Sequence, residues 1–512
     1  MILTKRRTKQ SEGECEMIKK YTYGTPFPTE SVTEQFAASE GMPEFGTIHL
    51  QEGFSFTYRL RDEDIVYGLG EANRGINKRG YQYISNNSDN AHHHEDVYSL
   101  YASHNFMIVS GEQTFGLYFD YPSTLTFDVG YTRSDELHIF CDRADLDLYV
   151  ITGENPYDIT KQFRKMIGRS YIAPKFAFGF GQSRWGYKTP EDFVTVAEKY
   201  RENHIPIDMV YMDIDYMDNY KDFTVNEEFR DFPQYVENLK KDHIRLVPII
   251  DAGVKIEEGY DVYEEGVEKN YFCKRQDGSD FVAAVWPGYT HFPDVLNPDA
   301  RKWFGEKYKR LTDAGIEGFW NDMNEPAIFF TPEGVKDVKE AMKAFIDKEE
   351  TVQDVWAIGA QVTGLANNAE DYAAMYHNVD GKMVQHDQVH NLFGYNMTRA
   401  AGEGLREISP DKRCLLFSRS SYIGMHRYGG IWTGDNKSWW SHILLNLKML
   451  PSLNMCGFLY TGADLGGFGC NTTRDLLLRW LALGVFTPLI IPARTQENRS
   501  VISLNTLRIS GI

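Results

Sequence analysis

The sequence predicts an α/β protein, in which an antiparallel β-sandwich domain precedes a (β/α)8 TIM barrel whose last unit is incomplete. Short apolar runs broken by Gly, Asp and Asn fill the first third of the chain, as in a sandwich. After Tyr171, strand-like and helix-like runs alternate, which predicts a parallel sheet. The 512 residues exceed one ordinary hydrophobic core, so two or more domains are expected.

The amino-terminal part divides into a leader and a sandwich. Residues 1–16 have no apolar segment of the signal-peptide kind, and we expect a disordered leader there. Residues 17–170 are the predicted sandwich domain. Its strands are expected in the partly alternating runs FSFTYRLRDEDIVYGLG, FMIVSGEQTFGLYFDYPSTLTFDVG and LHIFCDRADLDLYVITG.

Residues 171–489 are the predicted barrel. Strands are expected at 176–184, 207–215, 245–253, 318–324, 414–420, 429–435 and 458–464. Helix-like runs lie between most of them, for example at 190–204, 232–243, 299–315 and 438–455. Seven or eight such units over this length favour a closed barrel over an open doubly wound sheet. Insertions near 255–295 and 331–388 follow the third and fourth strands, where barrel enzymes build the walls of their active sites.

Composition narrows the choice of partners. The net charge of −19 repels phosphate backbones and anionic lipid, and no segment is apolar enough to span a bilayer, so neither nucleic acid nor a membrane is expected. The six scattered cysteines form no C-x-x-C pair, which predicts reduced thiols in a cytoplasmic protein without a zinc site. Aromatic residues, at 14%, suit sugar binding, although composition alone favours large β-rich cores as the reason. A homo-oligomer stays open.

Polar residues cluster where the predicted barrel strands end. Since the carboxyl ends of barrel strands converge on one mouth, these groups are expected around one pocket. For any single aspartate at a strand end, the alternative explanation is that it caps the helix that follows. For Asp215 and Asp464, a helix cap and a place in the pocket are equally good explanations. The strand-end groups are Arg184, Trp185, Asp213, Asp215, Asp251, Asp322, Glu325, Arg419, Asp435 and Asp464.

Carboxylates with Trp and Arg around one mouth, and no metal or phosphate motif, indicate glycoside chemistry. Cleavage of an acetal needs a carboxylic acid that protonates the leaving oxygen and a carboxylate that stabilises or traps the oxocarbenium-like centre. The two groups must differ in proton affinity, which their surroundings set. These residues alone leave retention and inversion of configuration open.

Several segments carry a more specific signal. GFWNDMNEPAIF (318–329) closely resembles the nucleophile signature of glycoside hydrolase family 31, which contains α-glucosidases and α-xylosidases, and RYGGIWTGDN (427–436) resembles its acid/base segment. YMDIDYMDNYKDFT, VPIIDAGV, AAVWPG, FSRSSYIG and YTGADLGGF match further family segments in the right order. The resemblance runs from about Tyr21 to Leu489.

The resemblance implies a retaining α-glycosidase, in first place an exo-acting α-glucosidase that removes terminal non-reducing α-linked glucose from small oligosaccharides and needs no cofactor or metal. It implies that Asp322 is the nucleophile and Asp435 the acid/base, with their carboxyl groups roughly 5–5.5 Å apart. Arg419 matches an arginine that pairs with the acid/base and the sugar. Glu325 and Asp464 are further candidates. The implied substrate-binding residues are Asp89, Asp213, Ile214, Val254, Trp286, Trp320, Met323, Arg419, Trp432 and Phe468.

The chain departs from the family pattern after Leu489. The family continues with a Met-Arg-x-His segment whose histidine binds the sugar, whereas residues 490–512 read IIPARTQENRSVISLNTLRISGI. Suitable codons from Ile490, read one frame over, restore a histidine and a family-like Glu-Gln-Glu. We therefore expect an aberrant tail that arises from a frameshift, an altered eighth strand, no eighth helix, and a chain that is unstable or nearly inactive.

Two rival functions stay open. An α-xylosidase of the same family would differ in whether its pocket accepts the C6 hydroxymethyl group of glucose. A catalytically impaired carbohydrate-binding remnant would bind sugar without turnover. His92, His93 and His94 have the appearance of metal ligands, but adjacent histidines on a loop rarely share one metal, and a polar loop is the preferred interpretation.

Overall fold

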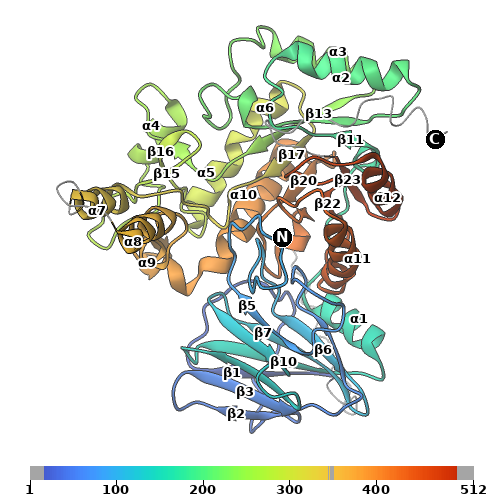
Figure 1. The fold of residues 1–512 in the computed structure, drawn as a ribbon, viewed down its shortest axis with the longest axis vertical. Coiled ribbons are helices and arrows are strands. Elements are labelled where there is room, and N and C mark those ends of the chain that lie inside the picture. The colour runs from blue at the N-terminus through green and yellow to red at the C-terminus, as the bar shows by residue number, and fades with distance from the viewer. Residues whose placement is uncertain (1–16, 344, 346–350, 493–512) are drawn as a thin grey trace, which may run out of the picture.

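The computed structural model describes residues 17–492 except 344 and 346–350. The predicted leader and residues 493–512 of the predicted tail lie outside the described residues. Figure 1 shows an antiparallel sandwich that is joined through helix α1 (Pro156–Met166) to a parallel barrel. This arrangement confirms the predicted fold class.

The amino-terminal domain consists of two five-stranded antiparallel sheets. Phe54 and Phe56 of β3 point into the core between them, because alternate strand residues face opposite sides of a sheet. Helix α1 packs on the other side of the first sheet, where Phe163 stacks on Phe106 with ring centroids 3.6 Å apart. The sheet orders are β1 (Ile18–Tyr23), β10 (Leu146–Thr152), β7 (Thr114–Asp120), β6 (Phe106–Ser110), β4 (Ile65–Gly68) and β2 (Thr47–His49), β3 (Phe54–Arg59), β9 (Glu136–Cys141), β8 (Leu125–Val129), β5 (Tyr81–Ser85).

In its described residues, the second domain contains a sheet of eight parallel strands in chain order. The first and last strands meet where the N–H of Ser183 donates to the carbonyl of Pro492 at 2.9 Å. The eighth strand, expected to be altered, is present and pairs in register with the seventh. The strands are β11 (Gly181–Gln182), β12 (Met209–Met212), β13 (Arg245–Ile250), β17 (Gly318–Asn321), β20 (Leu415–Ser418), β21 (Gly430–Trp432), β22 (Thr461–Asp464) and β23 (Leu489–Ile491).

The first barrel strand is much shorter than the predicted run 176–184. A 3₁₀ turn, η1 (Lys175–Phe178), occupies the first part of that run. Its backbone donors are used locally, since the N–H of Ala177 donates to the carbonyl of Pro174. The N–H of Phe180 donates to the carboxylate of Asp208 instead of to a neighbouring strand. Only β11 therefore pairs in the sheet.

Helices follow most barrel strands, and their starts are encoded locally. Asn297 caps α5 by accepting from the N–H of Asp299, and Thr189 and Asp192 form a capping box at α2. The predicted helix 299–315 is divided in two at Tyr308. The barrel helices are α2 (Pro190–Glu202), α3 (Phe232–Lys241), α5 (Pro298–Lys307), α6 (Lys309–Asp313), α10 (Phe393–Ile408), α11 (Trp440–Met455) and α12 (Arg474–Gly484).

Two insertions extend from the carboxyl ends of β13 and β17, on one side of the barrel in Figure 1. The first contains β14 (Val254–Lys255), α4 (Asp261–Glu268), β15 (Ala283–Val285) and β16 (Gly288–His291). The second contains α7 (Pro332–Lys343), α8 (Val352–Thr363), α9 (Ala369–Ala373), β18 (Tyr376–Val379), β19 (Lys382–Gln385), and the 3₁₀ turns η3 (His386–Gln388) and η4 (His390–Leu392). Further 3₁₀ turns are η2 (Ile214–Tyr216) and η5 (Met425–Arg427).

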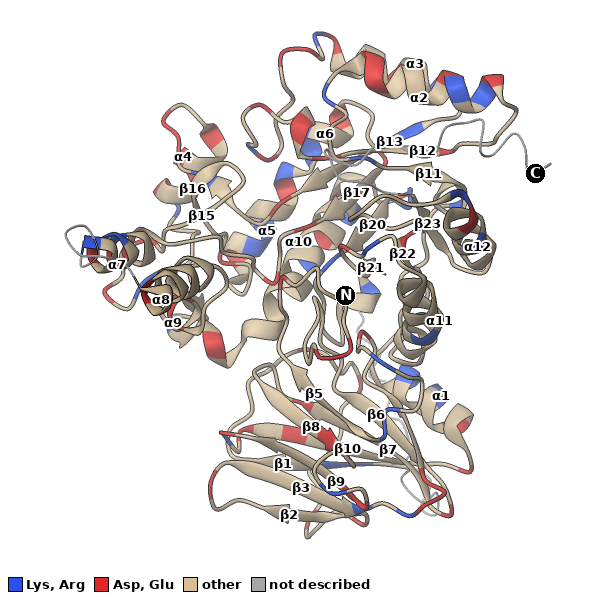
Figure 2. Cartoon of the chain, viewed as in Figure 1, with Lys and Arg blue, Asp and Glu red and all other residues tan. Residues whose placement is uncertain are grey.

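Charges of both signs are interspersed on the outer elements, as Figure 2 shows along α2 and α3. Of the helices in the described ranges, none is long and apolar enough to cross a membrane.

Candidate active site

The carboxyl ends of the barrel strands surround a cavity whose empty space, together with the open solvent at its mouth, is about 600 Å³. Most of the polar residues predicted from the strand ends lie here together, because parallel strands in a barrel end at the same mouth. The cavity is lined by Ser183, Trp185, Tyr211, Asp213, Ile214, Ile249, Trp286, Trp320, Asp322, Met323, Arg419, Trp432, Asp435, Asp464, Phe468 and Ile491.

Asp322 directly follows β17 and is fixed in orientation from two sides. Its Oδ1 accepts from the backbone N–H of Met323 at 2.7 Å and lies 2.9 Å from Nε of Arg419. Burial raises the pKa of Asp322, while the Arg419 cation and the Met323 N–H oppose that rise. The carboxylate form is therefore stabilised at the cavity wall by a cation and a backbone donor.

Arg419, directly after β20, is the buried cation of the site. Its guanidinium donates to both oxygens of Glu325, at 3.0 and 2.7 Å, and lies 3.4 Å from Asp89. The ring of Tyr101 from the sandwich domain is 4.6 Å from the guanidinium carbon. Among the described residues, its ion pairs join it to Asp322, Glu325 and Asp89, and Asp435 interacts with it only at longer range. The expected Arg419–Asp435 pair is thus replaced by a pair with Asp322.

Asp435 lies in the loop after β21 and is half-buried in the cavity. Burial raises its pKa to about 8, the distant Arg419 cation opposes the rise, and the charge of Asp322 adds to it. At neutral pH this carboxyl group therefore holds its proton. The two carboxyl groups predicted to act together thus face one cavity in different electrostatic surroundings.

Two more aspartates line the cavity. Asp213 directly follows β12, and burial raises its pKa to about 7. Asp464 ends β22 and accepts from the indole N–H of Trp432 at 2.7 Å, with a pKa that burial raises well above the usual range. Asp464 thus orients an aromatic wall and also faces the cavity. Asp215, the other ambiguous strand-end aspartate, faces Lys188 at 3.7 Å outside the cavity lining.

Aromatic rings form the walls. Trp320 and Trp432 meet edge to face with ring centroids 5.1 Å apart. Trp286, from the first insertion, packs edge to face on Trp185 at 5.0 Å and keeps 36% of its surface exposed. Phe468 completes the lining after β22. Such rings can pack on the C–H face of a pyranose while their edges donate hydrogen bonds.

Three predicted site residues lie behind the lining or away from it. Val254 is fully buried in β14, pairs with His291, and is absent from the cavity lining. Glu325 is fully buried behind Arg419. Asp89 reaches Arg419 from the loop after β5 of the sandwich domain.

Several residues that line the cavity are not among the predicted site residues, although the sequence contains a signal for some of them. Tyr211 lies two positions before Asp213, so the two side chains point the same way, and both line the cavity. Ile249 also lines the cavity, whereas Asp251, two positions further on, is buried and does not. Ser183 follows the shortened first strand. Ile491 also lines the cavity, although it lies within residues 490–512, which are predicted to depart from the family pattern.

Two models of known protein families match this chain. The family model described as the glycosyl hydrolases family 31 TIM-barrel domain matches residues 170–505, and the glycosyl hydrolase 31 N-terminal galactose mutarotase-like domain matches residues 9–128. The chain belongs to glycoside hydrolase family 31. The match of the barrel model extends to residue 505, so it does not set the region after Leu489 apart.

Individual family 31 proteins are similar over most of the chain. "Alpha-glucosidase 2" of Bacillus thermoamyloliquefaciens is 36% identical over 449 residues, covering 86% of this chain and 52% of that protein. "Alpha-glucosidase" of Saccharolobus solfataricus is 28% identical, covering 93% and 68%. The family 31 α-glucosidase structure from Bacteroides thetaiotaomicron gives a TM-score of 0.73 at 27% identity, covering 89% and 71%. The chain spans about half the length of the Bacillus relative.

Proposed function

We propose that this family 31 chain is a retaining, exo-acting α-glucosidase that removes terminal non-reducing α-linked glucose from small oligosaccharides. The observation that carries the proposal is that two carboxyl groups face one cavity, with Asp322 ion-paired to Arg419 and Asp435 in no ion pair with any residue of the described ranges. Relatives that bear the name α-glucosidase support glucose as the sugar.

The two carboxyl groups are suited to the two steps of a double displacement. Asp322, whose carboxylate form the Arg419 cation favours, attacks the anomeric carbon while Asp435 gives its proton to the leaving oxygen and the glycosidic bond breaks. Asp435, now a carboxylate, then takes a proton from water as that water displaces Asp322 from the anomeric carbon. Two inversions give net retention.

The remaining lining residues would hold the sugar. Asp213 and Arg419 offer polar groups for hydroxyls, and Trp286, Trp320 and Trp432 offer ring faces and edges for the pyranose. Asp89 would reach the same sugar through its position at Arg419.

The test is hydrolysis by the purified chain of p-nitrophenyl α-glucoside and maltose, with the anomer of the released glucose followed by proton NMR. The α-anomer is expected first. First release of the β-anomer would contradict retention, and faster hydrolysis of p-nitrophenyl α-xyloside would favour the α-xylosidase. Glucose binding by calorimetry without turnover would favour the impaired remnant.

Three further expectations remain proposals. The five described cysteines are free, which supports a reducing, cytoplasmic location. A homo-oligomer would be seen by light scattering of the purified protein. The expected frameshift at Ile490 is tested by sequencing the gene there. Codons that do not encode the family-like segment in the second reading frame would rule out the frameshift.

A further inference from the structure

Three buried histidines form a continuous hydrogen-bonded row outside the candidate active site. His377 Nε2 lies 2.8 Å from His386 Nδ1, and His386 Nε2 lies 2.8 Å from His390 Nδ1. All three side chains are at most 3% exposed. The ring of Tyr372 packs on His386 and His390, so the row is screened from water.

Each end of the row meets an oxygen atom. At one end, His377 Nδ1 lies 2.8 Å from Oδ1 of Asp294, whose Oδ2 accepts from the N–H of Asn378. At the other end, His390 Nε2 lies 2.7 Å from the backbone carbonyl of Asn87, in the loop that follows β5. The row thus crosses from the first insertion through the second to the sandwich domain.

The carbonyl of Asn87 fixes the position of every proton in the row. A carbonyl only accepts, so His390 must donate from Nε2. Burial lowers the pKa of His390 to about 4 and that of His386 well below the usual range, so both rings are neutral and each carries one N–H. His390 Nδ1 therefore accepts from His386 Nε2, and His386 Nδ1 accepts from His377 Nε2.

This assignment leaves one proton to be found. Four hydrogen bonds need four protons, whereas three neutral imidazoles supply three. The fourth lies between His377 Nδ1 and Asp294 Oδ1, either as the N–H of an imidazolium or as the O–H of a carboxylic acid. Without it two acceptors would face each other at 2.8 Å in a buried site.

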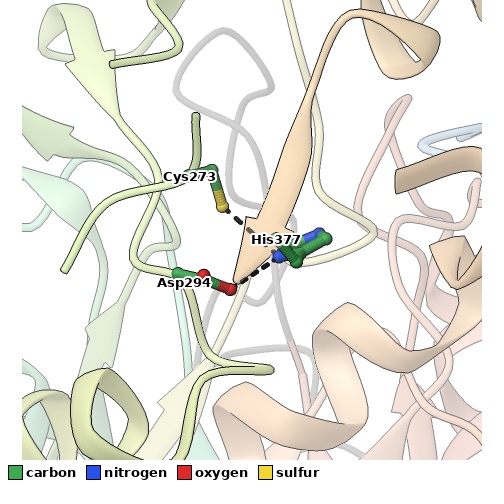
Figure 3. Close-up of side chains that lie close together, drawn as sticks. All are labelled: Cys273, Asp294 and His377. Atoms are coloured by element: carbon green, nitrogen blue, oxygen red, sulfur yellow. Dashed lines mark hydrogen bonds and ion pairs between the residues drawn. The ribbon is translucent and has the colours of Figure 1, made fainter. Parts of the chain in front are cut away.

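A metal ion is the other cation that could occupy this end. Figure 3 shows Cys273 beside Asp294 and His377, and among the described residues these three form the one group with metal-ligand spacing. Sγ of Cys273 lies 3.6 Å from His377 Nδ1. Ligand atoms around a tetrahedral zinc ion are separated by about 3.4 Å. The 2.8 Å between Nδ1 and Oδ1 suits a shared proton better than two metal ligands.

The far end of the row reaches the candidate active site. Asn87 also donates from Nδ2 to Oγ of Ser420 at 2.8 Å, next to Arg419. Two residues beyond Asn87, Asp89 lies 3.4 Å from the Arg419 guanidinium. The loop that the row holds is thus the loop that brings Asp89 to Arg419, which lines the cavity.

We propose that Asp294, His377, His386 and His390 form a positioning relay, which retains one buried proton and fixes the Asn87 loop so that Asp89 stays at Arg419. The relay connects both insertions to the sandwich domain. Its effect on catalysis rests on the proposed α-glucosidase function, whereas its proton arrangement does not.

Proton counting makes Asp294→Asn the informative substitution. The amide nitrogen of Asn can donate to His377 Nδ1 while its oxygen accepts from the N–H of Asn378, so the whole row remains satisfied without an extra proton. Asp294→Ala removes both contacts. Asp277→Asn is the matched control, because Asp277 is an exposed carboxylate of the same insertion that contacts Ser279 only through a local turn.

The proton arrangement is read from the full chain labelled with ¹⁵N-histidine, by long-range ¹H–¹⁵N correlation, with signals assigned by His386→Gln and His390→Gln. His386 and His390 are expected as Nε2–H tautomers, in wild type and in Asp294→Asn. Nδ1–H tautomers at either position would overturn the relay, as would one bound zinc ion per chain by elemental analysis.

Activity supplies the second readout. Asp294→Ala is expected to raise KM for p-nitrophenyl α-glucoside and to lower kcat/KM by roughly 10- to 100-fold through displacement of the Asp89 loop, whereas Asp294→Asn and Asp277→Asn stay near wild type. A kcat/KM of Asp294→Asn that is as low as that of Asp294→Ala would overturn the proposal. If Asp294→Ala does not fold, the activity of Asp294→Asn and the histidine tautomers of the wild type still test the proposal. A wild type without glucosidase activity would refute the proposed function and leave the NMR result to judge the relay.

Discussion

Nε of Arg419 lies 2.9 Å from Oδ1 of Asp322, so a buried cation supports the expected nucleophile, whereas no cation in the described part of the chain forms an ion pair with the expected acid/base, Asp435. Burial acts on both carboxyl groups in the same direction, and the nearby cation opposes it more strongly for Asp322. Arg419 and the backbone N–H of Met323 thus both contribute to a difference in proton affinity between the two aspartates, of the kind that glycoside cleavage needs.

Replacement of Asp322, the proposed nucleophile, gives the first prediction. Asp322→Ala is expected to reduce kcat for p-nitrophenyl α-glucoside by at least about 10³-fold, because no covalent glycosyl-enzyme can form. Initial rates on purified protein measure it. Asp313→Asn, which changes an exposed carboxylate paired with Lys309, should match wild type. An unchanged rate in Asp322→Ala would remove this residue from the mechanism.

The proposed acid/base role of Asp435 leads to a prediction for the alkaline side of the pH profile. Asp435 must carry its proton in the first step, so kcat/KM should fall as pH rises through a pKa of about 8. Asp435→Asn should abolish that limb and should harm hydrolysis of maltose far more than of 2,4-dinitrophenyl α-glucoside, whose leaving group needs no proton. Equal losses on both substrates would argue against general acid catalysis here.

The ion pair between Arg419 and Asp322 leads to a prediction for the acidic side of the pH profile of kcat/KM. Loss of the cation in Arg419→Gln should raise the pKa of Asp322, so the acid limb of kcat/KM should move to higher pH by roughly 1–3 units. The sign follows because Asp322 acts as a carboxylate and a nearby positive charge favours that form. Glu325→Gln in the same background relieves the unpaired charge of Glu325, which separates loss of folding from loss of catalysis. An acid limb that stays in place would mean that Arg419 does not set this pKa.

Stability of the sandwich domain depends on the contact between α1 and its sheet. Phe163 is fully buried and stacks on Phe106, so Phe163→Ala should lower the free energy of unfolding by about 3–5 kcal/mol. Chemical denaturation followed by circular dichroism measures the change. Tyr157→Ala on the same helix is the control, since that side chain is 76% exposed and should change stability little.

The parts that sequence predicts well are those with a strong local pattern. Apolar alternation predicted the sandwich, and polar residues directly after apolar runs predicted where Asp213, Asp322 and Arg419 would meet, because strand ends in a barrel share one mouth. Strand lengths were predicted less well. The first strand has only two paired residues, since tertiary contacts such as Asp208 to Phe180 N–H decide the ladder.

Long-range contacts escaped sequence reasoning for a different reason. Nothing local to Asp294 or His390 indicates that they lie in one hydrogen-bonded row, because the row depends on the packing of two insertions against another domain. The same holds for the choice of partner by Arg419, which the resemblance assigned to Asp435 and the structure gives to Asp322. Which carboxylate a buried guanidinium reaches depends on side-chain geometry, not on spacing.

The seam between β11 and β23 has one further consequence. The first strand has two residues and the last has three, and the hydrogen bond from Ser183 to Pro492 joins the ends of the barrel wall. Ser183 and Ile491 on either side also line the candidate active-site cavity. Local opening of the barrel should begin at this seam, so the backbone amides of β11 and β23 should exchange with deuterium before those of β13 or β17. A ligand that bridges the seam should slow the exchange of these amides.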